Sequence, residues 1–192
     1  MKKIGWVSLL IFWLAMPFAQ SQNKFEKEER IKFSEVPDKA KSFFAELKLE
    51  NKAKWYREFS EDGVSYETKT KLHKTLYSIE FDSAGNLKDV EYIINFNHLD
   101  KNIKRRLESQ FDSLFRKYRI IKTQRQYTGQ PDGLAQLVNT QKSNEPYTVK
   151  YEIVFSGKKE SYRKKYELTA DSTGKIISIG RVIPPEMNNL IY

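Results

Sequence analysis

The chain has 192 residues, a formal net charge of +9 and no cysteine, so neither disulfides nor a cysteine-linked lipid anchor can form. Residues 22–96 hold 14 basic and 15 acidic side chains, whereas residues 97–192 hold 18 and 10. The positive excess therefore belongs to the second half. Such an asymmetry concerns association with partners rather than the fold.

The first 21 residues have the pattern of a secretory signal. Two lysines precede an apolar run from Ile4 to Met16, and the small residues Ala19 and Ser21 favour cleavage before Gln22. The sequence therefore predicts a signal peptide over 1–21 and a flexible polar leader over 22–33. It also predicts a periplasmic or secreted protein with no integral membrane segment after cleavage.

The first half of the mature chain predicts one helix and four strands. Apolar residues at positions 36, 40, 43, 44 and 47 follow one helix face, so we expect a helix from Val36 to about Leu49–Asn51. Alternating and aromatic-rich stretches separated by turn residues predict strands at Lys54–Phe59, Val64–Leu72, Thr75–Asp82 and Leu87–Phe96.

The second half predicts the same order with a longer helix. Asn97 or Asp100 is expected to cap a helix whose apolar residues run from Leu99 to Tyr118. Strands are expected at Arg119–Tyr127, Tyr147–Phe155, Ser161–Ala170 and Lys175–Ile183. Residues 134–146 show no regular pattern and have no counterpart in the first half.

An internal repeat relates the two halves. Residues 77–87 and 166–176 are closely similar, and both contain an Asp-Ser-x-Gly turn, at Asp82–Gly85 and Asp171–Gly174. A repeat indicates one structural unit used twice. We therefore predict an α+β fold of two tandem repeats, each a helix packed on a roughly four-stranded antiparallel sheet. Repeat 1 spans 34–96, repeat 2 spans 97–183, and 184–192 form a C-terminal tail.

The repeated turns are expected to be structural. An aspartate at the start of a turn accepts backbone N–H groups, and the glycine adopts the positive φ that a hairpin with a glycine bulge needs. A cation site is the alternative, but calcium takes more oxygen ligands than this segment offers.

No pattern predicts catalysis, a cofactor or a metal site. His73 and His98 lack a second histidine or cysteine at ligand spacing. Glu58, Glu61 and Asp62 are typical of a solvated turn tip rather than an acid/base pair, and the usual hydrolase and phosphate-binding motifs are missing. We predict a protein that is not an enzyme, with an unrecognised hydrolase as an alternative.

Basic residues gather in two stretches of the second half. One runs from Lys101 to Arg125 and includes Lys104, Arg105 and Arg106; the other is Lys158–Lys165. A solvated helix face and a charged loop would explain them. The alternative is a surface for an acidic partner or for anionic envelope polymers or lipids. Nucleic acid is not an expected partner for an exported protein.

Several motifs resemble the PepSY-like domains of exported bacterial proteins, whose tandem form is similar to the β-lactamase inhibitor protein fold. The matching residues are Val36-Pro37, Trp55, Tyr66-Glu67, Phe81-Asp82 and Gly85, and then Tyr166, Asp171 and Gly174. The resemblance covers residues 34–183. It implies helices on one sheet face, an open concave binding face on the other, and no catalytic residues.

The open sheet face is the expected binding surface. Residues out of phase with the apolar strand positions should line it, namely Leu76, Ser78 and Glu80 in repeat 1 and Lys150, Glu152 and Val154 in repeat 2. Trp55 is a further candidate because tryptophan is frequent at contact sites.

These residues predict a non-catalytic exported binding module, protein-binding or inhibitor-like through its open sheet face. Its partner is an unknown envelope protein or peptide, acidic partners included. Lys104, Arg105 and Arg106 would speed association with an acidic partner, and the sheet face would supply selectivity.

Overall fold

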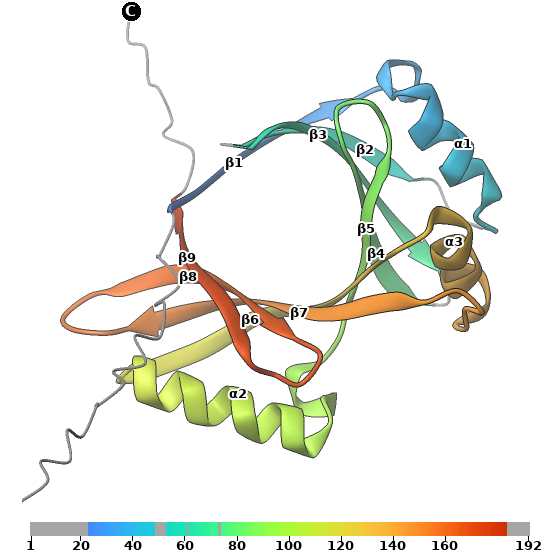
Figure 1. Ribbon diagram of the computed structural model, residues 1–192. Coiled ribbons are helices and arrows are strands. Elements are labelled where there is room, and N and C mark those ends of the chain that lie inside the picture. Colours follow the sequence, from blue (N-terminus) through green and yellow to red (C-terminus); the bar gives the residue numbers. More distant parts are fainter. Residues whose placement is uncertain (1–22, 49–52, 61, 73, 184–192) are drawn as a thin grey trace, which may run out of the picture.

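The computed structural model describes residues 23–48, 53–60, 62–72 and 74–183. Nine strands form one sheet that closes into a barrel in the order β1 to β9. Neighbouring strands are antiparallel, except that β1 and β9 pair in parallel, from Asn23↔Arg181 to Phe25↔Ile183, and close the ring. Figure 1 looks into the ring, with the helices on its outside.

The strands are β1 (Asn23–Ile31), β2 (Lys54–Ser60), β3 (Gly63–Leu72), β4 (Thr75–Phe81), β5 (Leu87–Ile93), β6 (Lys117–Gly129), β7 (Tyr147–Lys158), β8 (Arg163–Asp171) and β9 (Ile176–Ile183). The helices are α1 (Asp38–Glu46), α2 (Lys101–Leu114) and α3 (Pro131–Thr140), with short 3-10 turns at Phe33–Glu35 and Phe96–His98. None of the helices in the described part of the chain has the length and apolar character needed to cross a bilayer.

The prediction of two helix-on-four-strand repeats is wrong. Strand β5 pairs with β6 from Val90↔Tyr127 to Ile93↔Gln124, so the sheet continues across the boundary expected near residue 97. Each predicted four-stranded sheet would leave edge strands with unpaired backbone groups. Joining the two sets of strands and adding β1 satisfies these edges within one nine-stranded sheet.

The segment expected to be a flexible leader forms strand β1. It pairs along β2 from Glu26↔Ser60 to Ile31↔Trp55. The sequence concealed this strand because its residues are mostly charged and show no apolar alternation; its backbone pairing closes the ring instead. The predicted signal peptide, its cleavage site and the predicted C-terminal tail lie outside the described residues.

Helix α3 lies in the stretch for which no regular structure was expected. Pro131 opens the helix, where its missing N–H costs no hydrogen bond. Leu134, Ala135 and Val138 are buried on one face and join the core beneath α1. Gly133 weakened the helical pattern, and the apolar face is only about two turns long.

Two hydrophobic cores lie between the outer face of the barrel and the helices. The first lies under α1 and α3 and contains Ile79, Phe81 and Val138. The second lies under α2 and contains Phe111 and Phe155, whose ring centroids are 4.8 Å apart. Because these apolar strand residues face outward, the alternating polar residues face the barrel interior.

The repeated turns are equivalent in detail. Gly85 and Gly174 have φ values of 81° and 79°, as expected, and each donates its N–H to the carbonyl of the turn aspartate at 2.9 Å. A register shift precedes each turn, between Glu80 and Phe81 and between Thr169 and Ala170. The internal repeat therefore describes a bulge and turn that recur within one barrel, rather than two separate domains.

Candidate functional site

The inner face of the barrel is polar because the strands alternate between apolar outward and charged inward residues. On β4, Tyr77 and Ile79 are buried, whereas Leu76, Ser78 and Glu80 line the interior. Strands from β1 to β8 contribute in the same way. The result is a cavity of about 850 Å³ whose walls carry eight carboxyl side chains and six lysines.

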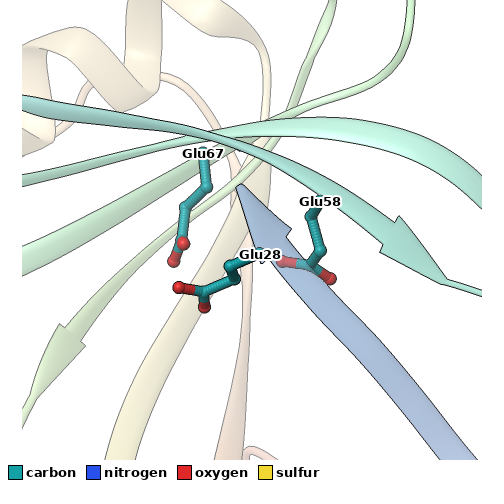
Figure 2. A group of neighbouring side chains, drawn as sticks. All are labelled: Glu28, Glu58 and Glu67. Carbon is teal, nitrogen blue, oxygen red and sulfur yellow. The ribbon is translucent and has the colours of Figure 1, made fainter. Parts of the chain in front are cut away.

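Three glutamates come together on one wall of this cavity. Glu28 on β1, Glu58 on β2 and Glu67 on β3 place carboxylate oxygens within 4.8 Å of one another (Figure 2). Register explains the grouping, because Glu28 lies opposite Glu58 in the β1–β2 pair, and β2 pairs in turn with β3. Sequence analysis had assigned Glu58 to a solvated turn tip, and this assignment is wrong.

A lysine neutralises part of this cluster. The Nζ atom of Lys69 lies 2.8 Å from Glu28 Oε1 and 2.9 Å from Glu67 Oε2. Burial lowers the pKa of this ammonium, but its hydrogen bonds and the charges of the two glutamates outweigh burial and raise it overall. The ammonium group therefore pairs with two of the three carboxylates.

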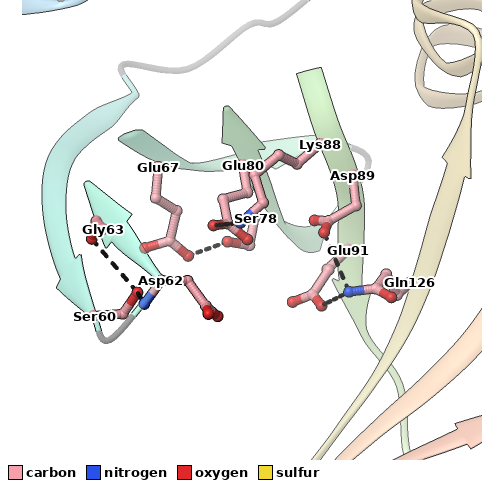
Figure 3. A network of polar contacts seen from close by, with 10 residues as sticks. All are labelled: Ser60, Asp62, Gly63, Glu67, Ser78, Glu80, Lys88, Asp89, Glu91 and Gln126. Carbon is pink, nitrogen blue, oxygen red and sulfur yellow. Dashed lines mark hydrogen bonds and ion pairs between the residues drawn. The ribbon is translucent and has the colours of Figure 1, made fainter. Parts of the chain in front are cut away.

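The next wall is built around the β4–β5 bulge. Because the register shifts after Glu80, Lys88 and Asp89 both reach the cavity although they are consecutive in the chain. Lys88 Nζ lies 2.6 Å from Glu80 Oε1. Ser78 donates its hydroxyl hydrogen to Glu67, so this bond joins the neighbouring strands β4 and β3 on the inner face of the barrel (Figure 3).

Asp89 and Glu91 form a second carboxyl pair on β5. The amide nitrogen of Gln126 donates to both, at 3.2 Å to Asp89 Oδ2 and 3.0 Å to Glu91 Oε1 (Figure 3). Gln124 donates to the other oxygen of Glu91 at 2.6 Å. Within the described residues, neither carboxyl has a lysine or arginine at ion-pair distance.

Burial favours the protonated forms of these two carboxyls. Burial is the main cause that raises the pKa of Asp89 to about 8, and the charges of Glu80 and Glu152 raise it further, whereas Lys88 lowers it. Burial and the charge of Asp89 likewise raise the pKa of Glu91 to about 8. The pair therefore takes up protons more readily than exposed carboxyls do.

The predicted binding residues of the strands fall into two groups. Leu76, Ser78, Glu80 and Lys150 line the cavity, as does Glu152. Val154 is only 5 % exposed, so it does not offer the exposed apolar surface expected of it. Leu76 is 53 % exposed, in keeping with the prediction for that residue.

The other predicted binding residues lie outside the cavity. Trp55 is buried in the first core, where its ring stacks on Phe81 at 5.9 Å. Lys104, Arg105 and Arg106 lie on α2, on the outside of the barrel. Lys104 contacts Asn97 at 2.8 Å, and Arg106 donates to Thr173 at 2.9 Å. These residues are therefore separate from the interior site.

The two predicted basic stretches meet on one end of the sheet. Strand pairing places Lys117 opposite Lys158, and Lys158 opposite Arg163. Arg119 and Lys165 flank Ser156 in the neighbouring row. These basic residues make this end of β6, β7 and β8 a positive strip. Like charges at directly opposite positions are unfavourable, so the strip is destabilising unless a partner neutralises it.

A second, smaller cavity of about 350 Å³ lies between α3 and the outer face of the sheet. Arg125 donates to the hydroxyl of Tyr92 at 3.1 Å, and the Tyr92 and Tyr127 hydroxyl oxygens are 3.2 Å apart. Burial and the hydrogen bond with Tyr92 raise the pKa of Tyr127. These hydrogen bonds stabilise the guanidinium group of Arg125 beside the hydrophobic core.

Sequence reasoning missed the main acidic residues of the cavity, which are Glu28, Glu67, Asp89, Glu91 and Glu167. One signal was available: acidic residues at alternate strand positions, such as Asp89 and Glu91, face the same side of a sheet. Their convergence from separate strands required the closed ring. The PepSY-like resemblance stays a prediction, because no protein-family model, curated protein or solved structure compared with this chain matches it.

Proposed function

We propose that this protein is a binding protein that holds a small polar molecule inside its barrel. The observation that carries the proposal is the cavity of about 850 Å³ lined by charged and hydroxyl side chains. Cavities of this size are typical of small-molecule sites. A barrel interior that served only for stability would be filled by apolar side chains, as it is in small barrels.

The ring changes the kind of partner that the inner face can take. The open sheet face expected from the sequence is instead the inside of a barrel, where a folded protein has no room to lie. A small molecule or a narrow extended segment can enter. The exported location and the absence of catalysis remain parts of the proposal, supported by the signal pattern of residues 1–21 and by the sequence motifs.

The proposal is tested by filling the cavity. Thr169 lines the cavity from β8, whereas Ser172 is exposed in the turn just beyond the same strand. Native mass spectrometry against a library of small polar compounds should show one-to-one complexes with the wild-type protein. We expect Thr169→Trp to abolish these complexes by occupying the space, and the matched control Ser172→Trp to retain them. Equal binding by both variants would place the ligand elsewhere and contradict the proposal.

The positive strip supports a second candidate function. Lys117, Lys158 and Arg163 form a row of like charges whose repulsion an anionic polymer would relieve. Binding of this kind should weaken steeply with salt. If Lys158→Glu abolishes retention on a polyanionic resin while Thr169→Trp does not, the strip acts independently of the cavity.

A further inference from the structure

We infer that the cavity selects small organic cations bearing primary ammonium groups, held by Asp89, Glu91 and the side-chain carbonyl of Gln124. This inference rests on the proposed function, since it names the ligand class of the same cavity. Three observations carry it: the acceptors on this wall, the pairing of the lysines near it, and the balance of charge when a cation enters.

The wall around Asp89 and Glu91 contains one buried acceptor that lacks a donor. Gln124 is 5 % exposed, and its Oε1 atom is buried without a hydrogen-bond partner among the described residues. Its amide nitrogen is already used by Glu91. A buried acceptor without a donor costs free energy, and an ammonium group supplies three donors from a single atom. Asp89 is itself 8 % exposed and offers a further carboxyl oxygen.

The lysines near this wall either pair with other carboxylates or lie beyond ion-pair distance of Asp89 and Glu91. Lys88 is paired with Glu80, and Lys69 is paired with Glu28 and Glu67. Lys122 on β6 is near enough to favour the ionised form of Glu91, yet outside ion-pair distance.

Three further carboxyls raise the pKa of Asp89: Glu80 and Glu67 across β4 and β3, and Glu152 from β7. Lys150 also lines the cavity, opposite Gln126, but within the described residues it forms no ion pair with Asp89 or Glu91. The carboxyls around the pair therefore favour a positive ligand.

Binding of a cationic ligand should release protons from Asp89 and Glu91. In the empty site, burial and mutual repulsion favour the protonated forms of Asp89 and Glu91. An ammonium group that arrives beside them stabilises the carboxylates, and their protons leave to solvent. A dication that displaces two protons leaves the charge of the cavity unchanged, so this uptake requires no net burial of charge.

The experiment uses three probes of equal length and different charge: 1,5-diaminopentane, 1,5-pentanediol and glutarate. Isothermal titration calorimetry at pH 7, in two buffers of different ionisation enthalpy, gives both the affinity and the number of protons released. We expect the diamine to bind at least about tenfold more tightly than the other two, with release of one to two protons per ligand.

Variants then locate the site. Glu91→Gln and Asp89→Asn keep shape and neutrality but cannot ionise, so each should weaken diamine binding at least about tenfold and reduce proton release. Glu160→Gln, in the exposed β7–β8 hairpin, is the matched control and should leave both unchanged. Because both site variants resemble the protonated wild type, loss of binding would not reflect loss of fold.

The outcomes separate the inference from the proposed function. Preferred binding of glutarate or pentanediol, abolished by Thr169→Trp, would overturn the cationic class and keep the cavity as a binding site. Diamine binding that releases no proton and is unaffected by either variant would also overturn the inference. If none of the probes binds, and if Thr169→Trp abolishes the binding of no library compound, the inference and the proposed function both fail.

Discussion

Gly174→Ala and Gly85→Ala should each lower the free energy of unfolding by about 2–4 kcal/mol. Both glycines have positive φ, and a Cβ at Gly174 would lie 2.9 Å from the backbone oxygen of Ile103 in α2. At Gly85 it would lie 2.7 Å from Cβ of Pro37, beside the start of α1. Each variant therefore adds a collision with a helix to the strain of the turn. Chemical denaturation of the purified variants measures the loss.

Gly63 supplies the control for this prediction. It also has positive φ, at 113°, but nothing lies within 4 Å of the Cβ position. We expect Gly63→Ala to lose less stability than either turn variant, because it carries backbone strain without a collision. If Gly85→Ala and Gly174→Ala are as stable as the wild type, the packing of the repeated turns against their helices is wrong.

The protein should be more stable at pH 5 than at pH 8, by at least about 1 kcal/mol. Asp89 and Glu91 have folded-state pKa values of about 8, against about 4 in the unfolded chain. Between these values the folded state binds more protons than the unfolded state, so the free energy of unfolding falls as pH rises from about 4 to about 8. Urea denaturation at several pH values gives the slope.

The double variant Asp89→Asn/Glu91→Gln isolates this effect from other titrating groups. It removes both ionisable carboxyls and keeps the amide donors of Gln124 and Gln126 nearby. Its stability should change less between pH 5 and pH 8 than that of the wild type, and at pH 8 it should be the more stable protein. A pH dependence identical to the wild type would show that neither carboxyl is protonated in the folded state.

Local features of this fold could be read from the sequence, and the closure of the ring could not. The helix cap at Asp100, whose carboxylate accepts from the N–H groups of Asn102 and Ile103, follows from residue type and position. The alternation on β4 likewise follows from side chains that are buried on one face only. Such features depend on neighbours within a few residues.

Ring closure depends on pairs that are distant in the chain. The β1–β9 pairing joins residues near 23 to residues near 181, and no local pattern in the charged β1 marks it. The repeat itself favoured two tandem units, each with its own four-stranded sheet, because it shows that units recur without showing whether their sheet edges join. Once the edges join, the sheet face that was predicted to be open becomes the inside of the barrel. Glu67 and Asp89 then line the same cavity, which their neighbours in the sequence did not indicate.

The absence of cysteine permits a direct test of the interior. Thr169→Cys places a single thiol in the cavity wall, and Ser172→Cys places one on the exposed turn three residues later. We expect a small thiol reagent to modify both, whereas a maleimide carried on a bulky branched polymer should modify only Ser172→Cys. Rapid modification of Thr169→Cys by the bulky reagent would show that this face is open to large partners, and would contradict a barrel interior that admits only small molecules.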